Sequence, residues 1–122
     1  MGEAMTHAVH IIVPMEPMNV NNYVRHTRSG RHYKTKEALS FEQIGAIACR
    51  GHSVSAKAYS VRIEVYQGKG KRGDLDNYAK QPLDLLTKTG VIHSDAAVVE
   101  LHMTKARDVS NPRTEIFVRA HE

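Results

Sequence analysis

Hydrophobic positions recur with two different periods along the chain, and the period predicts which kind of element each stretch forms. Residues 59–66 alternate apolar and polar side chains, which is typical of a strand with one buried face. The same alternation recurs over 97–103, where Leu101 and Met103 are expected to lie in the core, and over 114–120. Residues 9–13 form an apolar run that ends at Pro14. The pattern therefore predicts about four strands.

Helical spacing replaces this alternation over 35–50. Thr35 or Ser40 is expected to cap this helix, and Gly51 is expected to end it. We expect the helix to turn an apolar stripe towards the core, and the members of this stripe are Leu39, Ile44, Ile47 and Ala48.

A second helix is predicted over 77–89, followed by Gly90 at the position where helices often end. Pro82 costs about 3 kcal/mol inside a helix but is tolerated in the first turn, so the regular helix is expected to begin near Lys80. The positions expected to face the core are Leu83 and Leu86.

The remaining segments complete the fold prediction. Residues 14–22 are rich in proline and asparagine and are predicted to form a loop, whereas 25–34 forms either a hairpin or an open loop. The order strand, loop, helix, strand, helix, strand, strand indicates an α+β or mixed α/β fold, with two helices covering one side of a mixed sheet. We expect positions 1–122 to form a single domain.

Composition limits the class of protein. Hydrophobic residues make up 41% of the chain and charged residues 25%, as in an ordinary globular domain. A single cysteine, Cys49, forms neither an intrachain disulfide nor a cysteine-pair zinc site, which favours a reducing, cytosolic setting. No apolar run approaches the roughly 20 residues that span a bilayer. Residues 1–7 are polar and lack the apolar segment of a signal peptide, so secretion is not expected.

Basic residues gather in two stretches, although the formal net charge is only +4. Such clusters either track a phosphate backbone or form a solvated loop surface, and charge alone leaves both interpretations open. The predicted DNA-backbone contacts are Arg25, Arg28, Arg31, Lys34, Lys69, Lys71 and Arg72.

Two carboxylates, Asp74 and Asp76, lie between the second basic cluster and the second helix. Residues two apart in an extended segment point to the same side, so both carboxylates are expected to face one point. Mg²⁺ takes oxygen ligands of this kind together with substrate phosphate. The motif is short, and a helix-capping turn without a metal is the alternative.

Two further residues extend this candidate site. Lys80 follows Asp76 by one helical turn, where it either contacts phosphate or is simply the ion-pair partner of Asp76 or Asp84. Asp95 lies in the turn after the second helix. Spacing alone does not place Asp95 beside the other two carboxylates.

The second half of the chain resembles the RusA family of Holliday junction resolvases, and the first half resembles it more loosely. The matching residues are 71–80, Leu83-Asp84, Leu86, Gly90, Asp95 and Val98-Val99. The resemblance implies a mixed α/β homodimer that binds four-way DNA junctions and resolves them by paired symmetric nicks in recombination and repair. It also implies a requirement for Mg²⁺, with Mn²⁺ as a substitute, and a cytoplasmic, nucleoid-associated protein of bacterial or prophage origin.

The resemblance also implies residue roles. Asp74, Asp76 and Asp95 match the catalytic, metal-binding carboxylates of the family, and Lys80 matches its catalytically important lysine. Bound Mg²⁺ would orient a water for in-line attack on a phosphodiester. The chain departs from some relatives at Gly73, where they carry another basic residue, and before Asp95, where they carry a second acid. These departures leave junction affinity and sequence preference open.

Other functions compete with this interpretation. A non-catalytic DNA-binding protein could retain the same fold, although the presence of all three carboxylates and Lys80 argues against it. A metal-dependent nuclease that prefers flaps or forks is a further alternative. A nucleotide-sugar transferase, which also uses an Asp-x-Asp motif, is disfavoured because the chain is short for a donor and an acceptor site.

Overall fold

A mixed sheet forms the centre of the computed structural model, which describes residues 8–20, 24–26, 32–70 and 73–122, with the backbone alone at 24–26 and 32–34. The strand order is β1-β6-β4-β5, which confirms the predicted four-stranded mixed sheet. The strands are β1 Ala8–Val13, β4 Tyr59–Gln67, β5 Val98–Arg107 and β6 Arg113–Ala120. β4 and β5 run parallel, whereas β6 is antiparallel to both β1 and β4.

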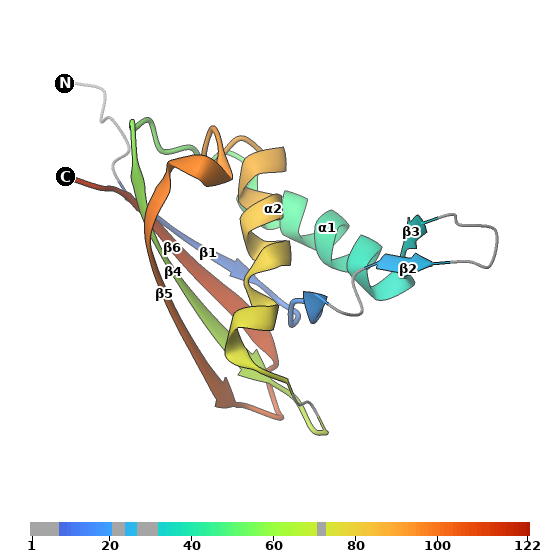
Figure 1. The fold of residues 1–122 in the computed structure, drawn as a ribbon. Coiled ribbons are helices and arrows are strands. Elements are labelled where there is room, and N and C mark those ends of the chain that lie inside the picture. Colours follow the sequence, from blue (N-terminus) through green and yellow to red (C-terminus); the bar gives the residue numbers. More distant parts are fainter. Residues whose placement is uncertain (1–7, 21–23, 27–31, 71–72) are drawn as a thin grey trace.

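Two helices cover one face of this sheet, as predicted, and leave the other face open (Figure 1). They are α1, Lys36–Cys49, and α2, Lys80–Lys88, and the short 3-10 turns η2, Leu75–Tyr78, and η3, Asp95–Ala97, flank α2. A separate antiparallel hairpin lies beyond the start of α1 and consists of β2, Val24–His26, and β3, His32–Lys34. The described part of 25–34 is therefore a hairpin rather than an open loop.

The core lies between the sheet and the two helices. A strand has a two-residue period, so β4 and β6 turn most of their apolar residues to the helices and their polar residues, together with Phe117, to the open face. The hydrophobic core residues of these strands are at most 1% exposed, and they are Tyr59, Val61, Ile63, Val65, Ile116 and Val118.

Helix α1 forms where the sequence predicts it, but it buries a different stripe. Thr35 caps the helix, because its side-chain oxygen accepts a hydrogen bond from the Ala38 N–H at 3.3 Å. Leu39, Ile44 and Ile47 are 45%, 37% and 63% exposed, so the prediction that they face the core is wrong. Of the predicted stripe, only Ala48 packs against the core. The buried positions are Ala38, Phe41, Gly45 and Cys49.

Close packing between α1 and α2 explains the choice of stripe. A Cβ atom on Gly45 would lie 2.6 Å from Leu85 Cδ2, so a glycine allows the two helices to approach this closely. The face of α1 that carries small and aromatic residues packs against α2. The face that carries the larger aliphatic residues is exposed to solvent.

Helix α2 begins at Lys80, as the position of Pro82 predicts, and the residues before it form the separate turn η2. Leu86 is fully buried and Leu83 packs partly against the core, which confirms both predicted positions. Gly90 follows with a φ of 80°, the left-handed conformation that ends a helix. No helix in the described ranges is long and apolar enough to cross a membrane.

A buried glutamine fixes the orientation of α2. The Gln81 side chain is fully buried, accepts a hydrogen bond from the Met18 N–H at 2.8 Å and donates one to the Ala38 carbonyl at 3.0 Å. These bonds join α2 to α1 and to the chain that follows β1. Both ends of the amide are thereby satisfied, as burial requires.

Strand β5 is an edge strand and is less buried than its alternation predicts. Val99 and Leu101 are 57% and 42% exposed, so the expectation that Leu101 lies in the core is wrong. Met103 packs partly against the core, as expected. An edge strand has a neighbour on one side only, so alternation alone overstates its burial.

Candidate functional site

The acidic turn η2 lies near the point where two parallel strands end. Because β4 and β5 are parallel, their carboxyl ends lie at the same edge of the sheet. The chain leaves β4 at Gln67 and reaches η2 after a basic, glycine-rich loop, and η2 packs against β5 (Figure 1). This topology brings the Asp74–Asp76 motif beside a strand that lies later in the sequence.

The two carboxylates are not arranged by strand alternation as expected. Asp74 is extended, with φ −72° and ψ 142°, but Asp76 belongs to the 3-10 turn. The turn closes because the Asn77 N–H donates to the Asp74 carbonyl at 3.0 Å and the Ala79 N–H donates to the Asp76 carbonyl at 3.3 Å. The two-residue rule for an extended segment therefore does not apply here, and any convergence of the carboxylates depends on their side-chain rotamers.

Both aspartates are exposed, and neither acts as a side-chain cap. Asp74 occupies the capping position of η2, but its side chain makes no cap hydrogen bond. Neither carboxylate has a hydrogen bond or ion pair with another described residue. The helix-capping alternative is thus not the role of Asp74 in this structure.

Lys80 opens α2 directly after the acidic turn. Its Nζ lies 3.2 Å from Asp84 Oδ1, an ion pair across one helical turn. Of the two partners that the sequence allowed, Asp84 is therefore the one engaged in this structure. The lysine remains largely exposed, so its ammonium faces solvent as well as Asp84.

Asp95 lies at the other end of α2. It begins η3, where the Thr87 hydroxyl donates to its carboxylate. The part of α2 between Lys80 and Thr87 spans about 10 Å, so the helix separates Asp95 from the acidic turn. Within the described residues, no group of three His, Cys, Asp or Glu side chains is placed to hold a metal ion.

The predicted DNA contacts fall largely outside the described residues. Arg28, Arg31, Lys71 and Arg72 lie outside them, and Arg25 and Lys34 are described by their backbone in β2 and β3. Lys69 is exposed in the loop that leads from β4 to η2. These seven residues remain predictions, with Lys69 beside the acidic turn.

Two basic residues near the site were not singled out from the sequence. The Lys105 Nζ donates to the Gly73 carbonyl at 2.7 Å, directly before Asp74, and Arg107 is exposed two positions later on β5. Both lie beyond the predicted strand 97–103, and they share one face because β5 extends to Arg107. Only the parallel pairing of β4 and β5 places that face beside Asp74, and the local sequence does not predict this pairing.

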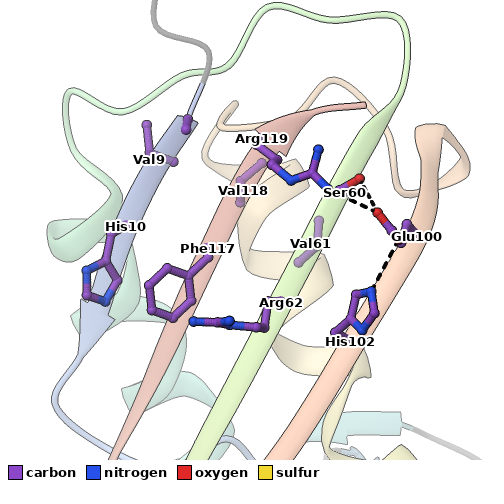
Figure 2. Close-up of a pocket in the computed structure, with 11 residues that line it drawn as sticks. Val9, His10, Ser60, Val61, Arg62, Glu100, His102, Phe117, Val118 and Arg119 are labelled. Carbon is purple, nitrogen blue, oxygen red and sulfur yellow. Dashed lines mark hydrogen bonds and ion pairs between the residues drawn. The ribbon is translucent and has the colours of Figure 1, made fainter. Parts of the chain in front are cut away.

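A separate hollow of about 590 Å³ lies on the open face of the sheet (Figure 2). None of the predicted site residues lines it. Its Glu100 carboxylate accepts a hydrogen bond from the Ser60 hydroxyl at 2.6 Å and lies 3.3 Å from both His102 and Arg119. The Ser60 hydrogen bond, followed by that of His102, lowers the pKa of Glu100. The size of this hollow alone would therefore select, as a candidate site, a face whose charged side chains are already paired with one another.

The fold and the acidic turn match a class of enzymes that cut DNA. The family model described as "Endodeoxyribonuclease RusA" matches residues 14–119, which begin directly after β1 and include β4, β5, nearly all of β6, both helices and all three aspartates. The chain therefore belongs to the RusA endodeoxyribonuclease family.

Curated relatives agree with this membership over most of their length. A crossover junction endodeoxyribonuclease from Enterobacteria phage 82 is 33% identical over 112 residues, which cover 89% of this chain and 92% of the relative. Its counterpart from Escherichia coli K12 is 32% identical over 111 residues, or 88% and 91% of the two chains. The counterpart from Shigella sonnei is 31% identical over the same shares.

Proposed function

We propose that this protein is a magnesium-dependent crossover junction endodeoxyribonuclease that resolves four-way DNA junctions by paired nicks. The supporting observation is the exposed acidic turn with Asp74 and Asp76, in a chain of the RusA family whose relatives are named for this activity. Such a substrate places its action in the cytoplasm, at the nucleoid.

The residues of the acidic turn fit a hard divalent cation. Mg²⁺ takes carboxylate oxygens and keeps several waters, and Asp74 and Asp76 are exposed and engaged with no other described residue. Bound there, Mg²⁺ or Mn²⁺ would polarise a phosphate and favour ionisation of a bound water. Lys80 would offer N–H donors to the same phosphodiester, since its ion pair with Asp84, the one it forms within the described ranges, leaves donors of its ammonium free.

The proposal includes a homodimer, because α2 separates Asp95 from the acidic turn within a single chain. β5 is an edge strand of 10 residues that starts directly after η3, and Lys105 in its second half contacts Gly73 beside η2. Antiparallel pairing of β5 with the same strand of a second copy would bring the partner's Asp95 towards Asp74 and Asp76. It would also cover the exposed Val99.

A junction-cleavage assay with a metal series tests the activity. We expect the protein to nick a mobile four-way junction in Mg²⁺ or Mn²⁺ and not in EDTA, and Asp76→Asn to bind the junction without cutting it. Cutting by Asp76→Asn at the wild-type rate would remove this residue from the site. Retarded but uncut DNA with the wild-type protein in Mg²⁺ would favour a non-catalytic DNA-binding protein, and faster cutting of flaps or forks would favour a different branched substrate.

Mixed dimers test the source of the third carboxylate. A dimer of Asp76→Asn and Asp95→Asn chains retains one intact site if each site combines residues of both chains, and none if each chain supplies its own. We expect the mixture to regain single nicks that neither variant makes alone. No recovery, with mixed dimers shown to form, would place all three ligands in one chain.

A further inference from the structure

Lys105 connects the edge strand β5 to the backbone beside the acidic turn. Its Nζ donates to the Gly73 carbonyl at 2.7 Å across a sequence separation of 32 positions. Gly73 immediately precedes Asp74, so the ammonium lies close to the candidate metal site. A surface lysine in a strand is ordinarily free to sample many rotamers, and this contact restricts it.

The Gly73 backbone that holds Lys105 is itself confined. Gly73 has a φ of 139°, a conformation that side-chain-bearing residues rarely adopt. A Cβ atom there would lie 2.7 Å from both Tyr78 Oη and Asn19 Nδ2. The carbonyl of Gly73 is therefore presented from a tightly packed segment, and the position of the Lys105 ammonium follows from it.

The bond to Gly73 leaves the charge of Lys105 uncompensated. An ammonium group has three N–H donors, and a backbone carbonyl accepts one of them without carrying a formal charge. Lys105 forms no ion pair with another described residue, whereas Lys80 pairs with Asp84 at 3.2 Å. Two donors and a full positive charge thus remain for an anion.

The surroundings of Lys105 favour a phosphate as that anion. Arg107 lies on the same face of β5, and Lys69 lies in the loop that leads from β4 to the acidic turn, so exposed basic residues gather at the edge where the two parallel strands end. A DNA backbone presents successive negative charges that such a group can contact together. A small carboxylate metabolite would need one cationic side chain, whereas several basic side chains gather here.

We propose that Lys105 binds a DNA phosphate beside the Asp74–Asp76 turn and so positions the strand that is to be cut. The inference rests on the proposed function and adds a substrate-binding residue to it. The Gly73 carbonyl orients the ammonium before DNA arrives, which reduces the side-chain entropy lost on binding.

Salt dependence of junction binding tests the phosphate contact. Affinity for a four-way junction is measured in Ca²⁺ at a series of salt concentrations for the wild type, Lys105→Met and the control Lys57→Met. Lys57 is also exposed but lies before β4, at the other end of the sheet. Each lost phosphate contact lowers the slope of log affinity against log salt by about one. We expect this change, with roughly tenfold weaker binding, for Lys105→Met and neither change for Lys57→Met.

Two further variants separate charge from structure. Lys105→Arg keeps the charge and should keep the wild-type slope, whereas Lys105→Gln keeps an N–H donor without charge and should lose about one unit of slope. A melting curve for each variant shows whether it is folded. A wild-type slope for folded Lys105→Gln and Lys105→Met would overturn the proposal, because a purely structural bond to Gly73 would not change counterion release.

The same assays distinguish this inference from the proposed function. If the wild type binds junctions with the Lys105-dependent slope but does not cut them in Mg²⁺, the nuclease proposal fails and the phosphate contact stands. If the wild type cuts and Lys105→Met has the wild-type slope, the phosphate contact fails and the nuclease proposal stands.

Discussion

Carboxylates on the two sides of the sheet differ in their partners. On the open face, Glu115 lies 2.7 Å from Arg113 and 2.8 Å from His10, and Glu100 bonds Ser60 and His102. At the acidic turn beside the covered face, Asp74 and Asp76 are exposed and form no hydrogen bond or ion pair with another described side chain. The open face carries the hollow of Figure 2, whereas the acidic turn carries the exposed carboxylates that the proposed metal would need.

This difference matters for the proposed site, because charge pairing affects how readily a carboxylate binds a cation. A carboxylate with two or three partners must lose them before it binds a metal or faces a phosphate, and that loss costs free energy. Accordingly the bond from Arg113 holds the pKa of Glu115 below its ordinary value. An exposed acid without partners can bind a cation without that cost.

Removing one carboxylate from each side should give the largest contrast. Asp74→Asn should reduce junction cleavage on the order of a thousandfold, since a metal supplies several kcal/mol of transition-state stabilisation. Glu100→Gln, an equally conservative change in the hollow of Figure 2, should leave the rate within about twofold. Single-turnover cleavage rates measure both, and equal losses would refute the distinction between the two faces.

The stability of the protein should depend more strongly on the buried Gln81 of the covered face than on an exposed glutamine. Gln81→Leu leaves the Met18 N–H and the Ala38 carbonyl without their partner, and an orphaned buried group costs about 1–3 kcal/mol. We expect the free energy of unfolding in urea to fall by about 3 kcal/mol. Gln43→Leu on the exposed side of α1 is the control and should change it little. A similar loss in both variants would mean that the hydrogen bonds of Gln81 contribute nothing specific.

Two loop glycines with positive φ should differ at the acidic turn. Gly73→Ala combines a φ of 139° with contacts at 2.7 Å, whereas Gly70→Ala has a φ of 79° and open space around the new Cβ. Both should lose about 1 kcal/mol of stability from backbone strain. We expect only Gly73→Ala to slow cleavage as well, by about tenfold, because it displaces the segment that carries Asp74. Equal cleavage rates for the two variants would show that this segment tolerates displacement.

Acid should weaken the open face in a measurable but smaller way. Hydrogen bonds from Arg113 lower the pKa of Glu115 and of Asp108. A carboxyl group whose pKa is lowered in the folded state stabilises the protein fully at pH values above its ordinary pKa. This stabilisation disappears as the pH falls through the lowered pKa. Wild-type unfolding free energy should therefore drop between about pH 5 and pH 3, and Arg113→Met should show a shallower drop from a lower starting value. Parallel pH curves would exclude this pairing as the cause.

Much of the fold was predictable because local patterns determine it. Strand alternation located β4, β5 and β6, an apolar run ended by Pro14 located β1, and Pro82 with Gly90 fixed both ends of α2. The buried side of α1 was not predictable, because two apolar stripes share helical spacing and only the fit of Gly45 against Leu85 selects between them. The burial of β5 depends on its edge position, which no alternation encodes.

The candidate site was predictable in its residues and not in its arrangement. Asp74, Asp76 and Lys80 were found from local spacing and a family resemblance, but the 3-10 turn and the pairing of Lys80 with Asp84 required the structure. Lys105 contributes through a contact between distant segments. Such contacts depend on strand order, and short sequence motifs do not contain it.

The buried Cys49 thiol can report when the structure around it opens. This thiol is the single cysteine, is 2% exposed on α1, and burial raises its pKa despite an opposing hydrogen bond from Thr89. A buried, protonated thiol reacts with a disulfide reagent only after the structure around it opens. The labelling rate of the unmodified protein therefore measures how often α1 separates from α2, and DNA bound across this domain should slow that rate if it clamps the helices together.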